Sequence, residues 1–263
     1  MDLEIETSPS GAELTSIKYN GNELLHQGKS VLDENGDIYW RRQAPILFPI
    51  VGSLKDNTTK IDGKNYHMSQ HGFARDMVFD IVKLSEREHE YVLKYNEDTL
   101  KQYPFKFELY VSYLVYGNEL TIKYRVKNVD NKPMYFGIGG HPAFKIDLKG
   151  NDYKVEFEKV EDEIKFYQLD SGLISYENTY INRSLLSNNC IKIKNDINKM
   201  EFDFTGFKYL ALWSKKNAPF LCIEPWYTTA DYVDSNQIFE EKKDNIKLDS
   251  GNEFACSYKI AFY

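Results

Sequence analysis

The segments Phe105-Lys-Phe-Glu-Leu-Tyr-Val-Ser-Tyr-Leu-Val115 and Leu120-Thr-Ile-Lys-Tyr-Arg-Val-Lys127 decide the fold class. In the first segment every odd-numbered position is apolar or aromatic, although several even positions are apolar too. In the second, such residues alternate with threonine, lysine and arginine. A period of two is typical of β-strands that bury one face. Gly117-Asn118 lies between them and suits a type II′ turn. The stretch therefore predicts an antiparallel hairpin.

The rest of the chain repeats this pattern. Residues 254–262 alternate in the same way, and Asn20-Gly21 and Asp62-Gly63 are sequences that favour type I′ turns. Only residues 97–103 show a helical turn, which Pro104 ends. Many short strands joined by tight turns predict an all-β fold, a large antiparallel β-sandwich.

Length and composition agree with this fold. The chain has 263 residues, 15% of them aromatic, and it carries a net charge of −7. A chain of this length buries roughly 70–75% of its unfolded surface, so it needs no disulfides. No basic stripe is present, so nucleic acid is not an expected partner. No linker or repeat divides the chain, and we expect one domain over residues 1–263, with the polar segment 161–198 forming excursions at one edge.

Cysteine usage and apolar runs bear on the cellular location. Cys190, Cys222 and Cys256 are odd in number and widely spaced, which matches neither a disulfide framework nor a zinc motif. Residues 1–11 lack the features of a signal peptide. The longest apolar run, residues 44–51, is too short to span a membrane. We expect a cytoplasmic protein without a membrane partner.

The segment Gly137-Ile-Gly-Gly-His141-Pro-Ala-Phe144 contains the first candidate for chemistry. Gly139 and Gly140 would leave room for a ligand against the backbone, and Pro142 fixes the direction in which the chain leaves. Histidine has a usual pKa of about 6.5, so it donates or accepts a proton near neutral pH. The alternative is a buried histidine whose hydrogen bonds are satisfied within the core.

Glu224 is the second candidate, at the end of the apolar run Pro219-Phe-Leu-Cys-Ile-Glu224-Pro-Trp226. Desolvation would raise the pKa of this carboxyl group and make it a stronger base. Trp226 offers a flat face on which a sugar can stack, whereas we expect Cys222 in the core rather than as a nucleophile. The alternative for Glu224 is a strand-end residue capped by a turn. If they form an acid–base couple, we expect the groups at 141 and 224 to converge across one concave surface, about one pyranose ring apart.

His71-Gly-Phe-Ala-Arg75 is a third candidate segment. Gly72 can take a positive φ or let a ligand approach the backbone. The alternative is a loop histidine near an ion pair. The spacing of His67 and His71 also matches a helical zinc pair, but the turn upstream and the glycine downstream argue against a helix, and we expect no metal.

Arg41 and Arg42 precede the apolar run in Tyr39-Trp-Arg-Arg-Gln-Ala-Pro45. An arginine can hold a sugar hydroxyl or a phosphate with its forked donors. Both can equally be solvated surface charges. In a strand only one of the two can point inward.

Four of these segments together resemble the aldose 1-epimerase (galactose mutarotase-like) family, and most of all its LacX-type branch, which shares features with the hexose-6-phosphate mutarotases. They are Trp40-Arg-Arg-Gln-Ala-Pro-Ile-Leu-Phe-Pro-Ile-Val-Gly52, His71-Gly-Phe-Ala-Arg75, Gly140-His-Pro-Ala-Phe144 and Glu224-Pro-Trp226. The resemblance implies a galactose mutarotase-like supersandwich with an open sugar-binding cleft.

The resemblance also implies roles for individual residues. His141 is similar to the family's general acid, Glu224 to its general base and His71 to a supporting histidine that hydrogen-bonds the sugar. Arg42 or Arg41 corresponds to the substrate-binding arginine, and Arg75 to an arginine that helps to bind phosphate.

We therefore expect a cofactor-independent isomerase that interconverts the α and β anomers of an aldohexose, with or without a phosphate group. It would act as a monomer or a homodimer. A non-catalytic carbohydrate-binding protein, a glycoside hydrolase that pairs Glu224 with Asp231 or Asp234, and a purely structural protein are the alternatives.

Overall fold

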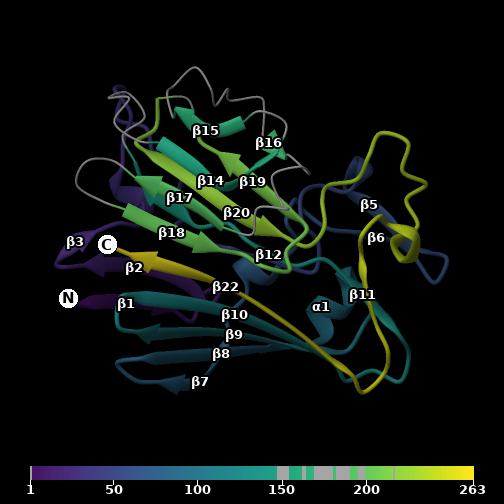
Figure 1. Ribbon diagram of the computed structural model, residues 1–263. Helices are drawn as coiled ribbons and strands as arrows, with labels where there is room; N and C mark the ends of the chain where they lie inside the picture. The colour runs from purple at the N-terminus through teal and green to yellow at the C-terminus, as the bar shows by residue number, and fades with distance from the viewer. Residues whose placement is uncertain are drawn as a thin grey trace.

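The hairpin expected around residues 105–127 forms the middle of a nine-stranded antiparallel sheet in the computed structural model (Figure 1). Strands β9 (Phe107–Tyr116) and β10 (Glu119–Asn128) pair in register, with Leu120 opposite Val115. On its other side β10 pairs with β22 (Glu253–Phe262), where Leu120 lies opposite Ile260. The alternating apolar side chains of both strands face the core, which confirms the predicted period of two.

The structure describes residues 2–146, 154–161, 164–168, 180–181, 190–194, 199–215 and 217–263. The nine-stranded sheet has the order β15-β14-β17-β18-β22-β10-β9-β8-β7. The strands not yet given are β15 (Ile164–Gln168), β14 (Lys154–Glu161), β17 (Cys190–Lys194), β18 (Lys199–Asp203), β8 (Glu88–Lys94) and β7 (Asp80–Leu84).

A second antiparallel sheet covers part of the first one. Its order is β16-β19-β20-β12-β4, and β13 also pairs with β20. The strands are β16 (Tyr180–Ile181), β19 (Tyr209–Trp213), β20 (Phe220–Trp226), β12 (Gly139–Gly140), β4 (Ile46–Leu47) and β13 (Ala143–Lys145). All seven residues of β20 are buried, so this strand is covered on both faces.

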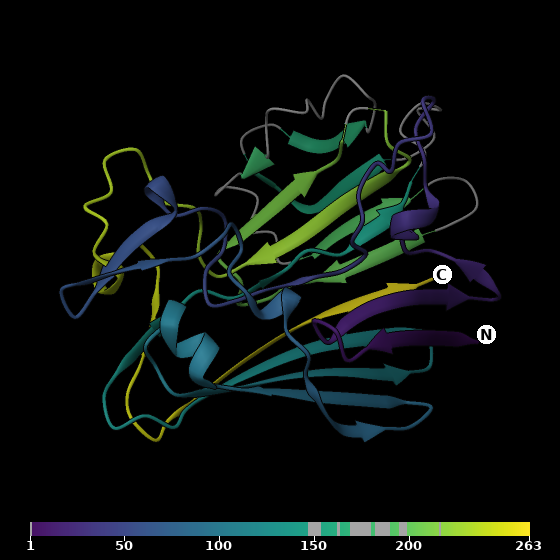
Figure 2. The same ribbon diagram turned by 180° about the vertical axis from the view of Figure 1, so that it is seen from behind.

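Contacts between the two sheets form the core of a sandwich. Phe144 on β13 and Phe202 on β18 meet edge to face, with ring centroids 5.1 Å apart. A Cβ atom on Gly140 would lie 2.8 Å from the hydroxyl of Tyr124 on β10 and 2.9 Å from that of Tyr258 on β22. The predicted all-β antiparallel sandwich is therefore confirmed, and both faces of the molecule show the layering (Figures 1 and 2).

Three smaller sheets and several short helices complete the described chain. The sheets are β1 (Leu3–Ser8) with β2 (Glu13–Tyr19) and β3 (Asn22–Glu23), β5 (Thr58–Ile61) with β6 (Lys64–His67), and β11 (Met134–Phe136) with β21 (Ile246–Leu248). The helices are α1 (Glu97–Gln102) and the 3-10 turns η1 (Gly28–Ser30), η2 (Lys55–Asn57), η3 (Ala74–Asp76) and η5 (Phe239–Glu241).

The local predictions agree with these elements. Asn20-Gly21 and Asp62-Gly63 have positive φ at both residues, as a type I′ turn requires. Helix α1 occupies the predicted helical turn, and Asn96 caps its first turn. Within the polar segment 161–198, β15 and β16 lie at sheet edges, and β17 lies inside the nine-stranded sheet. Apart from these strands and Glu161, which ends β14, the segment falls outside the described residues. Among the described helices none is long and apolar enough to cross a membrane.

Candidate functional site

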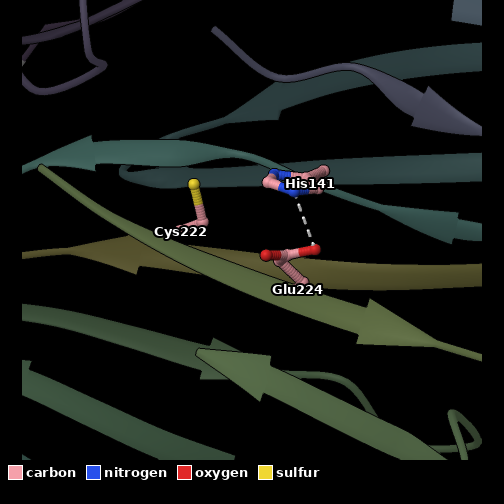
Figure 3. A group of neighbouring side chains, drawn as sticks. All are labelled: His141, Cys222 and Glu224. Atoms are coloured by element: carbon pink, nitrogen blue, oxygen red, sulfur yellow. Dashed lines mark ion pairs between the residues drawn. The ribbon is translucent and has the colours of Figure 1, made fainter. Parts of the chain in front are cut away.

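Strand β20 brings His141 and Glu224 together. His141 and Pro142 connect β12 with β13, and both of these strands pair with β20, through Gly139 opposite Trp226 and Ala143 opposite Cys222. The backbone N–H of His141 donates to the carbonyl of Pro45, 3.1 Å away, which fixes the loop from the other side. The result is a distance of 3.1 Å between Nε2 of His141 and Oε2 of Glu224 (Figure 3).

The predicted separation of one pyranose ring is wrong, because the two groups are in direct contact. The ring oxygen O5 and the hydroxyl oxygen O1 are both bonded to C1, so an acid and a base that serve these atoms must themselves be neighbours. His141 and Glu224 are such neighbours.

Burial controls the charges of this pair. Glu224 is 1% and His141 7% exposed. Desolvation raises the pKa of Glu224 well above 4.5, although the nearby indole N–H of Trp226 partly opposes this rise. Desolvation also lowers the pKa of His141 to about 3. No described side chain donates a well-aligned hydrogen bond to either carboxyl oxygen of Glu224. The environment therefore favours a neutral imidazole beside a protonated carboxyl group. That pair has the same number of protons as the ion pair of an imidazolium and a carboxylate.

Aromatic rings surround His141. Trp40 stacks on the imidazole with ring centroids 5.0 Å apart and an angle of 29° between the planes. Trp213 on β19 meets it edge-on at 5.8 Å, and both tryptophans are partly exposed. We did not predict a role for either tryptophan from the sequence. The only available signal was the position of Trp40 beside the arginine pair, within a segment that carries the family resemblance.

His71 forms a second side of the site. Its imidazole lies edge-on to that of His141 at 5.5 Å and is 6% exposed. Nδ1 accepts a hydrogen bond of 3.0 Å from the backbone N–H of Gly52, so in the neutral ring the proton is on Nε2. Desolvation and the neighbouring His141, Arg75 and Arg42 lower the pKa of His71 well below 6.5. His71 is thus a neutral hydrogen-bond donor.

The two candidate arginines at 41 and 42 lie in different environments. Arg41 is exposed, whereas the side chain of Arg42 is 28% exposed and donates to Oδ1 of Asp76 at 2.7 Å. Arg75 is more buried and donates to the carbonyl of Gln70. Burial and the charge of Arg42 lower the pKa of Arg75 to about 10. Arg42 and Arg75 are therefore close neighbours, and both act electrostatically on His71 and His141.

The glycines expected to leave room for a ligand are instead in contact with the protein. A Cβ on Gly139 would lie 2.8 Å from Cδ1 of Trp226, and Tyr124 and Tyr258 occupy the space beside Gly140. A Cβ on Gly72, whose φ is +71°, would lie 2.3 Å from the carbonyl oxygen of Phe48. All three glycines allow close packing. The prediction of ligand space beside Gly139 and Gly140 is therefore wrong, whereas Gly72 has the positive φ that was one of its two expected roles.

Three other expectations concern residues near or around the site. Trp226, expected to offer a flat face to a sugar, is only 4% exposed, because its ring packs against Gly139 and edge-on to His71. His67 ends β6 and His71 lies in a loop, so they do not form a helical pair. Cys222 is fully buried beside Phe220, and burial raises the pKa of its thiol, as a core position predicts.

The glycoside hydrolase alternative would pair Glu224 with Asp231 or Asp234. Oδ1 of Asp231 lies 2.8 Å from Nζ of Lys242, and both side chains are about 5% exposed or less. Oδ2 of Asp231 accepts a hydrogen bond from the backbone N–H of Lys55. Asp234 is exposed. Asp231 is therefore engaged in a buried ion pair.

Comparison with known proteins shows consistent relatives. The chain is 29% identical to the chromosomal and plasmid LacX proteins of Lactococcus lactis subsp. lactis, over 94% of this chain and 92% of theirs. A galactose mutarotase related enzyme from Lactobacillus acidophilus superimposes with a TM-score of 0.89 at 28% identity, over 99% of this chain and 94% of that one. A galactose mutarotase-like protein from Lactobacillus casei superimposes with a TM-score of 0.90 at 27% identity, over 99% and 97%.

The family model for aldose 1-epimerase matches residues 2–217, which include His71 and His141 and end before Glu224. This match extends over most of the chain, and the similar solved structures extend over nearly all of it. The chain belongs to the aldose 1-epimerase family.

Proposed function

We propose that the protein is a mutarotase that interconverts the α and β anomers of an aldohexose, with Glu224 and His141 as the proton-transfer pair. The observation that carries the proposal is the 3.1 Å contact between Nε2 of His141 and Oε2 of Glu224, nearly buried and next to partly exposed aromatic rings. A sugar presents O1 and O5 from one edge, so two groups in contact with each other can serve both atoms.

The reaction begins when the carboxyl proton of Glu224 passes to Nε2 of His141, which leaves an imidazolium beside a carboxylate. Glu224 takes the proton of the O1 hydroxyl while His141 gives its proton to O5, and the C1–O5 bond breaks to leave an aldehyde. Rotation about C1–C2 then exposes the other face, and the same two groups return the protons as the ring closes. Only protons pass between the protein and the sugar, and the C1–O5 bond that breaks is formed again on closure, so the chemistry is redox-neutral. Acid–base assistance of this type contributes about 10²–10⁴-fold.

The charge balance of the site suits this cycle. The opening step ends with a protonated Glu224 and a neutral His141, and burial favours that same distribution. The environment thus stabilises the protonation states that the pair has at the open-chain stage. The pair takes one proton from O1 and gives one to O5, so its total number of protons does not change. In this proposal Arg42, Arg75 and the Nε2–H of His71 donate hydrogen bonds to hydroxyl groups, or to a phosphate group if the substrate has one.

Polarimetry of freshly dissolved α-glucose, α-galactose and glucose 6-phosphate tests the activity directly. Glu224→Gln should slow anomer exchange by at least about 10²-fold while the protein remains folded, and His141→Asn should lower kcat more than it raises KM. Glu86→Gln, at an exposed position, is the matched control. An undiminished rate in E224Q would refute the role of Glu224. Sugar binding without any acceleration by the wild-type protein would indicate a carbohydrate-binding protein instead.

A further inference from the structure

Cys222 places a thiol group beside the proposed proton-transfer pair. Cys222 and Glu224 are two positions apart on β20, so their side chains project from the same face of the strand, toward His141 (Figure 3). One ligand atom from each of His141, Cys222 and Glu224 lies within 4.8 Å of the other two. The proposed mechanism uses the imidazole and the carboxyl group but leaves the thiol without a role.

Imidazole nitrogen, thiolate sulfur and carboxylate oxygen are the three protein ligands typical of zinc. Around a tetrahedral zinc ion such atoms lie about 3.3–3.7 Å from one another, given bond lengths of about 2.0–2.3 Å. The distance of 3.1 Å between Nε2 and Oε2, and the limit of 4.8 Å for all three atoms, are close to this geometry. Side-chain adjustments on the order of 1 Å would complete it.

The charges also fit a divalent ion. Cys222 is fully buried and Glu224 is 1% exposed, and an isolated charge in such a place is costly. One thiolate, one carboxylate and a neutral imidazole balance the two positive charges of the ion, so the complex as a whole is neutral. Both carboxyl oxygens of Glu224 lack a well-aligned donor among the described residues, and coordination would give them a partner.

We infer that His141, Cys222 and Glu224 form a zinc-binding site whose occupation inhibits the protein. As the ion binds, the thiol proton and any proton on the carboxyl group are released to solvent, and the fourth coordination position is left for water. Inhibition rests on the proposed function, because the ion occupies the atoms to which proton transfer is assigned. Binding of the ion does not depend on that function.

Titration with Co²⁺, a coloured substitute for Zn²⁺, tests the binding. The wild-type protein, first treated with a chelator, should bind one ion per chain and show a thiolate-to-cobalt charge-transfer band that zinc displaces. Cys222→Ala should lose this band and bind zinc at least about tenfold more weakly. Cys256→Ala and Cys190→Ala are the matched controls and should keep both properties. Absence of the band in the wild-type protein, or its persistence in C222A, would overturn the inference.

Activity measurements separate this inference from the proposed function. Zinc should slow mutarotation by the wild-type protein and by C256A, reversibly on addition of a chelator, and should leave the rate of C222A unchanged. Equal inhibition of C222A would overturn the inference. Cysteine-dependent binding in a protein without mutarotase activity would remove the proposed function but keep the site. Cys222→Ser, which preserves the size of the side chain, replaces C222A if thermal melting shows that C222A is unfolded.

Discussion

The indole ring of Trp40 lies over the imidazole of His141, with the centroids 5.0 Å apart and the planes inclined by 29°. The face of an indole ring attracts a cation, so it favours the protonated imidazole by about 0.5–2 kcal/mol. Desolvation acts in the opposite direction and lowers the pKa of His141 to about 3. Trp40 therefore counteracts the effect of burial at the group that we propose as the acid.

Trp40→Ala should reduce kcat by about 2–30-fold, because the attraction for the charged ring is lost. It should also move the limb of the kcat–pH profile that belongs to His141 to lower pH. Trp40→Phe, which keeps an aromatic face, should retain most of the rate. A reduced rate with an unshifted profile would show that Trp40 only supports the fold.

Arg42→Ala should raise KM for the sugar by about tenfold or more while kcat stays within a few-fold, since a hydrogen bond from a charged donor contributes about 1.5–3 kcal/mol. Steady-state polarimetry separates the two constants. Arg41→Ala is the matched control, because this neighbouring side chain is exposed, and its KM should not change. The opposite result would assign substrate binding to Arg41.

Burial should give His141 and Glu224 opposite effects on stability as the pH changes. The pKa of His141 is lowered to about 3, so its contribution is present above pH 6.5 and is lost as pH falls toward 3. The pKa of Glu224 is raised, so its contribution is present below pH 4.5 and is lost as pH rises toward the higher value.

Urea unfolding over a range of pH tests these signs. E224Q should gain stability relative to the wild-type protein as pH rises above 4.5, and H141N should gain it as pH falls below 6.5. Each difference should change by at most about 1.4 kcal/mol per pH unit. Stability curves that run parallel to the wild-type curve would contradict the shifts. E86Q again provides the exposed control.

Gly72→Ala should be much more destabilising than Gly117→Ala. Both glycines have positive φ, +71° and +60°, but a Cβ would meet the backbone of Phe48 at position 72 and open space at position 117. The strained φ costs about 1–2 kcal/mol at each site, and crowding adds about 1–3 kcal/mol at Gly72. Urea unfolding of both variants measures the difference, and equal losses would exclude the steric effect.

Local patterns were sufficient to predict the strands and turns. In β10, Leu120, Ile122 and Tyr124 face the core because side chains alternate along any strand, and that alternation is visible in the sequence. Asn20 and Gly21 adopt positive φ. Few other residues do so at low cost, and this is why the pair marks a type I′ turn in the sequence. Such features depend only on residues close together in the chain, so they can be predicted from a single sequence.

The geometry of the site depends on pairing between distant segments, and local sequence patterns do not reveal which strands pair. Nothing in the residues around His141 indicates that β12 and β13 both pair with β20, and so the convergence with Glu224 was predicted but the direct contact was not. A glycine that accommodates a neighbouring backbone looks in sequence like one that accommodates a ligand. Trp213 ends an apolar strand and looks like an ordinary core residue, yet it is partly exposed beside His141.

The two-sided pairing of β20 determines which changes in chain length the site can tolerate. Because hydrogen-bonded strand partners set the distance from His141 to Glu224, residues added or removed between β13 and β19 need not alter it. A single residue inserted within β20 between Cys222 and Glu224 would have the opposite effect, since it would turn the carboxyl group to the other face of the sheet. Changes in chain length between β13 and β19 are thus compatible with the same pair of groups in contact.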